Sequence, residues 1–143
     1  MKHELFDSLW SYLVSNNPNE LISVEKKRNI REVIWDKING IDDLIKQMEH
    51  DGVPQITIIE VCMHELTQDF IPSRYQYISE ILESEFEDMY LTLVETGSLT
   101  YEICNLIEEC GDVFNSFSFS VETEDDVFLE YAIIGTIANY LGD

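Results

Sequence analysis

His64 and Glu65 are the first residues whose types suggest catalysis, because a His-Glu pair on a helix occurs in zinc proteases. Those enzymes bind zinc with a second histidine four residues after the first, and that position is occupied here by Gln68. Cys62 lies two residues before His64, on a well-separated face of a helix, so these two side chains do not form a compact metal site. This part of the sequence therefore predicts no zinc centre.

The three cysteines are an odd number, which does not suit a framework of disulfide bonds. Cys104 and Cys110 are six residues apart, which places them about 240° apart around a helix and away from a shared metal ion. We expect the cysteines to be buried free thiols with a structural role. Free thiols are typical of a reducing compartment, so we expect a cytoplasmic protein.

Other signatures of catalysis are missing from the sequence. It contains neither Gly-x-Ser-x-Gly nor a glycine-rich phosphate loop, and only three histidines are present to serve as a base. The carboxylate pairs at 42–43 and 125–126 lie near expected helix starts, where solvated charge is a simpler interpretation than an acid-base pair. We therefore predict no enzyme, no metal and no cofactor; the alternative is a small-ligand protein or enzyme with an unrecognised pocket. The tyrosines that could line such a pocket are expected to pack in the core instead: Tyr75, Tyr77, Tyr90, Tyr101, Tyr131 and Tyr140.

Charge is the most informative property of these 143 residues. The chain has 29 acidic and 8 basic residues, and its formal net charge of -21 opposes binding to the phosphates of nucleic acids. Every Lys and Arg lies at or before Arg74, and the residues after Arg74 include 16 acidic and no basic ones. We therefore exclude direct binding to DNA or RNA and expect a protein partner, with a basic surface as the best match.

Glu80, Glu83 and Glu87 follow i, i+3, i+7 spacing, which aligns them along one face of a continuous helix. This row resembles a strip of phosphates, so one hypothesis is an inhibitor that mimics nucleic acid and occupies the basic groove of a DNA- or RNA-binding protein. The simpler alternative is a solvated face that keeps the protein dispersed. The predicted partner-binding surface comprises six carboxylates: Glu80, Glu83, Glu87, Glu108, Glu109 and Asp112.

A basic cluster lies in the N-terminal half of the chain. Residues 25–28 read Glu-Lys-Lys-Arg, and Arg31 follows shortly after. This cluster offers opposite charge to the acidic half of another copy, which would give an electrostatically steered homo-oligomer. An isolated solvated patch is the simpler alternative.

No targeting or membrane segment is expected. Residues 1–16 carry Lys2, Glu4 and Asp7 among the apolar positions, so they do not form a basic region followed by an uninterrupted apolar one. No run reaches the length of about 18 apolar residues that a membrane helix needs. We predict neither a secretory signal nor a membrane span.

The apolar residues recur mostly at spacings of three and four, which predicts an all-α fold. With only 6 glycines and 3 prolines, the chain has few residues that interrupt helices. Gly40 lies inside the expected helix 24–50, and because glycine disfavours a helix interior we consider a kink or a short break there. We expect about six helices, covering residues 4–15, 24–50, 54–71, 73–96, 99–110 and 123–141.

Several residues have the types that begin or end helices. Ser23, Ser73, Ser98 and Thr123 are expected N-caps, and Gly97 is expected to end the helix before it.

The segment 113–121 breaks the helical pattern. Phe117, Phe119 and Val121 alternate with serines, as in a short strand. Because no second alternating segment is present to pair with it, the alternative is an extended connector whose phenylalanines fill gaps between helices. The sequence leaves both interpretations open.

Three stretches resemble a known family. Residues 73–75 read Ser-Arg-Tyr, and the apolar stripe after them ends in Glu-Phe at 85–86; segments 9–18 and 131–141 fit the same pattern. Together they resemble a family of small proteins of unknown function from Bacteroidetes bacteria, often encoded on conjugative elements. Residues 56–59 are apolar and β-branched where that family tends to be rich in alanine. The resemblance implies a multihelical fold and supplies no activity, partner or site residue.

The sequence shows neither an internal repeat nor a linker rich in Pro, Gly or Ser. We therefore predict one helical domain over residues 1–143. The predicted function is that of a protein-interaction module without catalysis.

Overall fold

The computed structural model describes residues 1–142, which form ten α-helices and one short 3-10 helix. No strand occurs in this part of the chain, so the all-α prediction is confirmed. The expected number of about six helices is too low, because two of the expected helices are each interrupted and two short helices are added.

The chain divides into unit 1, residues 1–70, and unit 2, from residue 71 onward. Each unit has a hydrophobic core of its own. The sequence, which has no linker of typical composition at this point, predicted a single domain. A single cooperative unfolding transition of the whole chain would be the solution test of that prediction.

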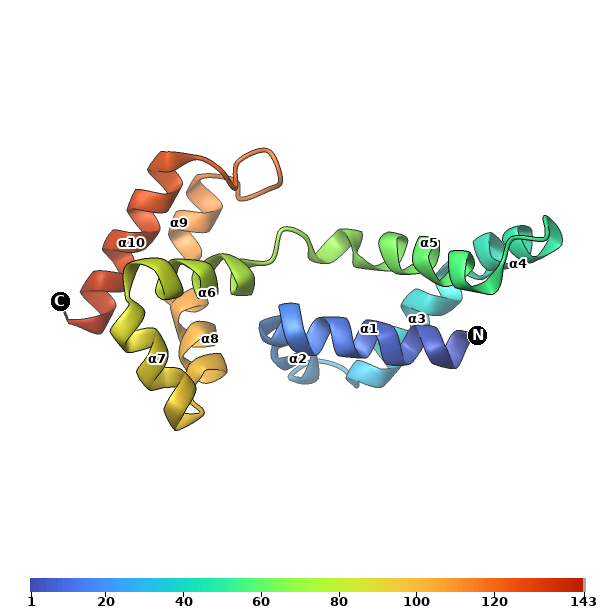
Figure 1. Cartoon of the computed structure of the whole chain (residues 1–143), viewed down its shortest axis with the longest axis horizontal. Helices are drawn as coiled ribbons and strands as arrows, with labels where there is room; N and C mark the ends of the chain where they lie inside the picture. The colour runs from blue at the N-terminus through green and yellow to red at the C-terminus, as the bar shows by residue number, and fades with distance from the viewer. Residues whose placement is uncertain (143) are drawn as a thin grey trace. The chain divides into compact units, whose positions relative to one another are not determined.

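Unit 1 is built around its first helix. Leu5, Leu9 and Leu13 recur at four-residue intervals, so they share one face of that helix and are all buried. This helix contacts the second, third and fifth helices of the unit (Figure 1). The helices of unit 1 are α1 (Lys2–Asn16), α2 (Pro18–Glu25), α3 (Ile30–Gly40), α4 (Asp42–His50) and α5 (Gln55–Thr67), followed by the 3-10 helix Gln68–Phe70.

Helix α2 was missed because Pro18 was interpreted only as the end of α1. Proline cannot continue a helix, but it suits the first turn of a new one, where Pro18 lies. The expected N-cap Ser23 is inside α2. The true cap of α3 is Asn29, whose side chain accepts a hydrogen bond from the backbone N–H of Arg31 at 2.9 Å.

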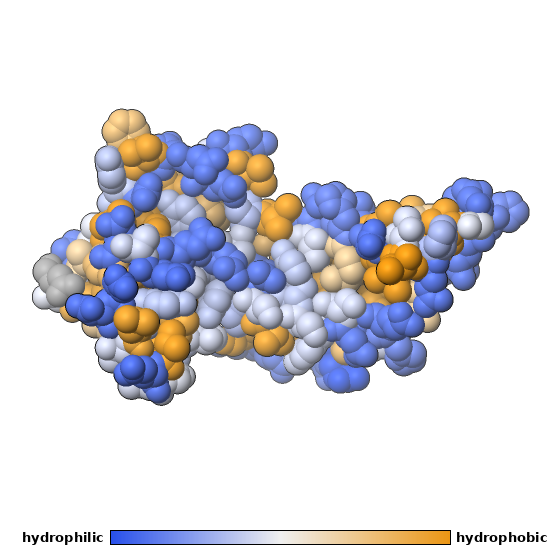
Figure 2. All heavy atoms as spheres, in the orientation of Figure 1, coloured by the Kyte–Doolittle hydropathy of each residue, from blue (hydrophilic) through white to orange (hydrophobic). Residues whose placement is uncertain are grey.

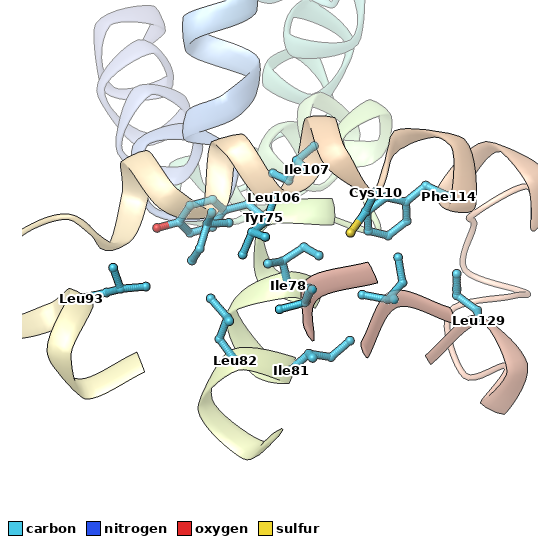
Figure 3. Packing of buried hydrophobic residues seen from close by; sticks show 13 residues of the cluster. Tyr75, Ile78, Ile81, Leu82, Leu93, Leu106, Ile107, Cys110, Phe114 and Leu129 are labelled. Carbon is cyan, nitrogen blue, oxygen red and sulfur yellow. The ribbon is translucent and has the colours of Figure 1, made fainter. Parts of the chain in front are cut away.

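Unit 2 packs five helices around one core. The helices are α6 (Arg74–Glu85), α7 (Glu87–Thr96), α8 (Leu99–Glu109), α9 (Gly111–Ser116) and α10 (Val127–Leu141). Helix α6 contacts α7 and α8, and α10 contacts α8 and α9. Figure 3 shows buried side chains of these helices, including Tyr75, Ile78 and Phe114, gathered in the interior. The predicted cap Ser73 is confirmed, because its side chain accepts a hydrogen bond from the N–H of Gln76 at 3.1 Å.

The expected helix 73–96 is interrupted at Phe86. This residue has φ -135° and ψ 49°, outside the helical region, and it separates α6 from α7. Its side chain is partly buried against the core of unit 2. Glu83 and Glu87 therefore lie on different helices, and the predicted row of three carboxylates is broken. Gly97 has the left-handed φ of 72° and ends α7 as predicted.

Residues 114–121 form neither a strand nor an extended connector. Phe114 belongs to α9, which ends at Ser116, and residues 117–126 run mostly through turns to α10. Phe119 nevertheless fills the interior as the connector hypothesis proposed, since its ring lies 4.9 Å from that of Phe114 and 5.2 Å from that of Tyr77. Thr123 lies within these turns, where its hydroxyl accepts a hydrogen bond from the N–H of Ser120 at 2.8 Å. It is therefore not the cap of the last helix.

Candidate partner-binding surface

A hollow on the surface of unit 2 brings together carboxylates that are far apart in the sequence. It has a volume of about 280 Å³. Its walls come from α6, from the turns before α10 and from α10 itself. We call it the acidic hollow, and it is lined by Tyr77, Glu80, Ile81, Ser84, Glu124, Asp125 and Glu130.

Of the six carboxylates that the sequence analysis selected, Glu80 lines the acidic hollow. The others are exposed and are not among the lining residues: Glu83 on α6, Glu87 in the first turn of α7, Glu108 and Glu109 in the last turn of α8, and Asp112 in the first turn of α9. The structure thus places the predicted surface on four helices rather than on one continuous strip.

The sequence analysis missed Glu124, Asp125 and Glu130 as members of this surface. Their neighbourhood was interpreted as a helix beginning at Thr123, which would put residues 124 and 125 inside the first turn. The helix starts only at Val127, so Glu124 and Asp125 lie in the turn before it. The dense run of acidic residues was a usable signal, but its position in the fold depended on where α10 begins.

Tyr77 contributes an aromatic wall to the acidic hollow. Its ring packs edge-on against Phe114 at 5.7 Å, and its buried hydroxyl has no hydrogen-bond partner among the described residues. Burial, together with the negative charges of Glu130 and Asp126, raises the pKa of Tyr77 to about 12. The phenol is therefore neutral near pH 7, and the negative charge of the hollow comes from its carboxylates.

Up to residue 142, no carboxylate of unit 2 forms an ion pair with a cationic side chain. Arg74 is the only Lys or Arg after residue 70. Its guanidinium donates to the Asn115 side chain at 3.1 Å and lies over the ring of Phe114, 4.9 Å from its centre. The ion pairs of the described residues all lie in unit 1: Lys2–Asp42, Arg28–Asp36, Lys37–Asp69 and Lys46–Asp42. The carboxylates of the acidic hollow thus have no counter-charge in an ion pair among the described residues of unit 2, and their field favours the approach of cations.

Helix α10 exposes apolar side chains beside this hollow. Its inner face carries the buried Leu129 and Ile133. Its outer side presents Val127, Phe128 and Tyr131, with 50%, 73% and 65% of their surface exposed. We call these three residues the aromatic patch, after the exposed rings of Phe128 and Tyr131. Figure 2 shows apolar side chains next to hydrophilic ones over the start of this helix. Throughout residues 1–142, no helix combines the length and the apolar character needed to cross a membrane.

The six tyrosines expected in the core divide into three groups. Tyr75 is buried, as expected, with 8% of its surface exposed. Tyr77 and Tyr90 are half-buried and pack against the core of unit 2. The expectation of a core position is wrong for three others, which are exposed: Tyr101, Tyr131 and Tyr140.

The cysteines are free thiols, and Cys62 and Cys110 are fully buried as expected. Cys104 is only half-buried, so the expectation of a buried position is wrong for it. Burial raises the pKa of each of the three, that of Cys110 to about 11. A thiol that stays protonated is a weak nucleophile. His64 is exposed and lies 3.3 Å from the amide of Gln68. Within the described residues, no group of three or more His, Cys, Asp or Glu side chains is arranged to hold a metal ion.

Comparison of the chain with protein-family models, with curated proteins and with solved structures finds no match. The resemblance to small Bacteroidetes proteins stays a prediction.

Proposed function

We propose that this protein is a non-catalytic interaction module of the cytoplasm whose unit 2 binds a protein partner with a basic surface. The observation that carries the proposal is the position of exposed aromatic side chains next to unpaired carboxylates on one helix. Glu130 of the acidic hollow and Phe128 and Tyr131 of the aromatic patch all belong to α10. The cytoplasmic location rests on the free thiols.

The two features supply different parts of a binding energy. Exposed aromatic side chains bury much apolar area when a partner covers them, and aromatic residues are enriched among the residues that dominate protein interfaces. The carboxylates of the hollow attract Lys and Arg side chains and so favour a basic partner over an acidic one. A partner that makes both contacts would gain affinity from the patch and selectivity from the hollow.

The hypothesis that the protein mimics nucleic acid depended on a regular row formed by Glu80, Glu83 and Glu87 on one helix. The interruption at Phe86 places Glu87 on a different helix from Glu80 and Glu83, so the spacing no longer supports that hypothesis. A basic DNA- or RNA-binding protein remains one kind of partner with the required charge, without any imitation of phosphate spacing.

The test is affinity capture from lysate of the native host with two variants of equal charge change. One carries Glu80→Lys, Glu124→Lys and Asp125→Lys in the hollow. The control carries the same reversal at three exposed carboxylates of unit 1, Glu49, Glu60 and Glu65. Bound proteins are identified by mass, at low and at high salt.

We expect the unaltered chain and the control to retain the same basic protein at low salt, and the hollow variant to lose it. Loss from both variants alike would mean that only overall charge matters, which contradicts a specific site. Retention by the hollow variant would remove the acidic hollow from the interface. If no protein is retained selectively, the acidic surface serves solubility alone.

A further inference from the structure

Unit 1 has an apolar groove on its surface that its own core does not fill. The groove has a volume of about 400 Å³ and lies where α1, α2 and the start of α3 meet. Trp10 and Ile22 are 37% and 48% exposed. We call this the apolar groove, and it is lined by Trp10, Leu21, Ile22, Glu25, Lys26 and Ile30.

Two consecutive lysines, the first of which lines the groove, have no ion pair among the described residues. Lys26 lines the groove, Lys27 is its neighbour in the chain, and both are exposed. The Glu25 carboxylate, which accepts a hydrogen bond from the N–H of Ile30 at 3.1 Å, also lines the groove and offsets one of the two charges, so the three residues together keep one net positive charge. The other basic side chains of unit 1 are engaged: Lys2, Lys37 and Lys46 in ion pairs, Arg28 with Asp36, and Arg31 over the ring of Phe6.

The chain has 29 Asp and Glu residues, yet Lys26 and Lys27 form no ion pair with any of those that the structure describes. The groove therefore combines an apolar surface with nearby positive charge. The matching ligand has an exposed apolar or aromatic side chain with carboxylates close to it. The same chain carries such a segment at the start of α10, where Phe128 follows Glu124 and Asp125.

We propose that the apolar groove binds the aromatic patch of a second copy of this chain, with Phe128 as the inserted side chain. Lys26 and Lys27 form the positive edge of this contact. Glu124 and Asp125 of the second copy supply the opposite charge. The inference rests on the proposed function in one respect, since it uses the aromatic patch as a binding surface.

The net charge of -21 does not prevent this contact at moderate salt. At about 0.15 M ionic strength, charges farther apart than about 8 Å are largely screened. Repulsion between the whole copies is then weak, while opposite charges in direct contact still attract. The apolar side chains supply a contribution that salt does not remove.

The groove and the patch are different surfaces, so each contact pairs unlike surfaces of two copies. Each copy offers one of each, so a copy that binds through its patch still has a groove to offer. A mixture of variants can therefore separate this arrangement from a dimer in which the groove pairs with a groove or the patch with a patch.

The experiment measures the mass of the full chain by analytical ultracentrifugation over a range of concentrations. Ile22→Glu disables the groove, and Phe128→Ser disables the patch; both side chains are exposed, so folding should be preserved. The matched controls are Val61→Glu in unit 1 and Leu91→Ser in unit 2, which alter other exposed apolar residues. Helix content of every variant is checked by circular dichroism.

We expect the unaltered chain and both controls to exceed the monomer mass of 16.7 kDa as concentration rises. Each of the two disabled variants alone should remain monomeric. An equal mixture of them should form dimers and nothing larger, because one intact groove and one intact patch remain.

Three results would overturn the proposal: a monomeric unaltered chain, disabled variants that assemble normally, or a mixture that stays monomeric. A monomeric chain would leave the groove to a different acidic partner. The proposed function is judged separately, because capture of a basic protein by a monomeric chain, lost in the hollow variant, would support it while this inference fails.

Discussion

The backbone N–H of Phe128 donates a hydrogen bond to the Asp126 carboxylate at 2.8 Å, and this contact caps the start of α10. The helix therefore begins at Val127, and the first turn carries both Val127 and Phe128 with their side chains largely exposed. Asp126 thus determines where α10 begins, and with it the position of the backbone that carries the aromatic patch.

Replacing this cap should destabilise unit 2. We expect Asp126→Ala to lower the free energy of unfolding by about 1 kcal/mol, the usual cost of losing an N-cap side chain. Asp125→Ala is the matched control, since it removes the same charge from an exposed neighbour that does not cap. Urea unfolding followed by circular dichroism measures both. Equal losses from the two variants would contradict the role assigned to Asp126.

The two cores predict that unit 2 can be weakened by itself. Phe114 is fully buried in unit 2, and Phe114→Ala should cost about 3–5 kcal/mol of unfolding free energy. Trp10 and Trp35 are the only tryptophans and both lie in unit 1, so tryptophan fluorescence reports unit 1 alone. We expect the circular dichroism transition to shift and the fluorescence transition to stay. Phe128→Ala, at an exposed position, is the control and should change little.

One cooperative domain, as the sequence predicts, would give the opposite result in this experiment. Both signals would then shift together, because a loss in either core would destabilise the whole chain.

Tyr77 should make stability fall at high pH. Its pKa is raised from 10.0 to about 12 in the folded chain, so the folded state holds the phenolic proton more tightly than the unfolded state does. The stabilisation is complete below pH 10 and is lost as pH rises from 10 towards 12. Tyr77→Phe should show a smaller loss over this interval, measured by urea unfolding at each pH. The exposed Tyr131→Phe serves as control and should follow the unaltered chain.

Because the helix is interrupted at Phe86, we expect charge reversal at Glu80 and at Glu87 to affect partner binding differently. Glu80 lines the acidic hollow and Glu87 does not. We expect Glu80→Lys to weaken binding of the captured basic partner about tenfold, a coupling of roughly 1.4 kcal/mol for charges in direct contact. Glu87→Lys makes the same change in net charge and should have a smaller effect. Titration of the purified partner compares them, and equal weakening would show that only the overall charge is sensed.

Much of the fold follows from local signals in the sequence. The four-residue spacing of Leu5, Leu9 and Leu13 identifies α1, and Ser73 and Gly97 mark helix ends because their side chain or backbone satisfies free peptide groups locally. These features depend on residues within one turn, which is why a sequence reveals them.

The features that were missed depend on tertiary packing. The residues around Phe86 contain no Gly or Pro, and the interruption there places an aromatic ring against the core of unit 2. Thr123 and Asp126 are both residue types that cap helices. Asp126 caps α10, because Thr123 lies in the turns before it and accepts a hydrogen bond there from Ser120. Packing of Phe119 from these turns against Tyr77 depends on tertiary structure. The positions of Glu124 and Asp125 follow from the choice of cap, so the sequence identified Glu80 and the acidic half of the chain but not the other carboxylates of the hollow.

The interruption at Phe86 also changes the electrostatic surroundings of two carboxylates. Glu87 and Asp88 lie in the first turn of α7. Aligned peptide dipoles give a helix N-terminus the equivalent of about half a positive charge, which stabilises anions there. In one continuous helix the same residues would lie mid-helix, out of reach of that charge. The backbone thus provides a local counter-charge in a unit whose only basic side chain is Arg74.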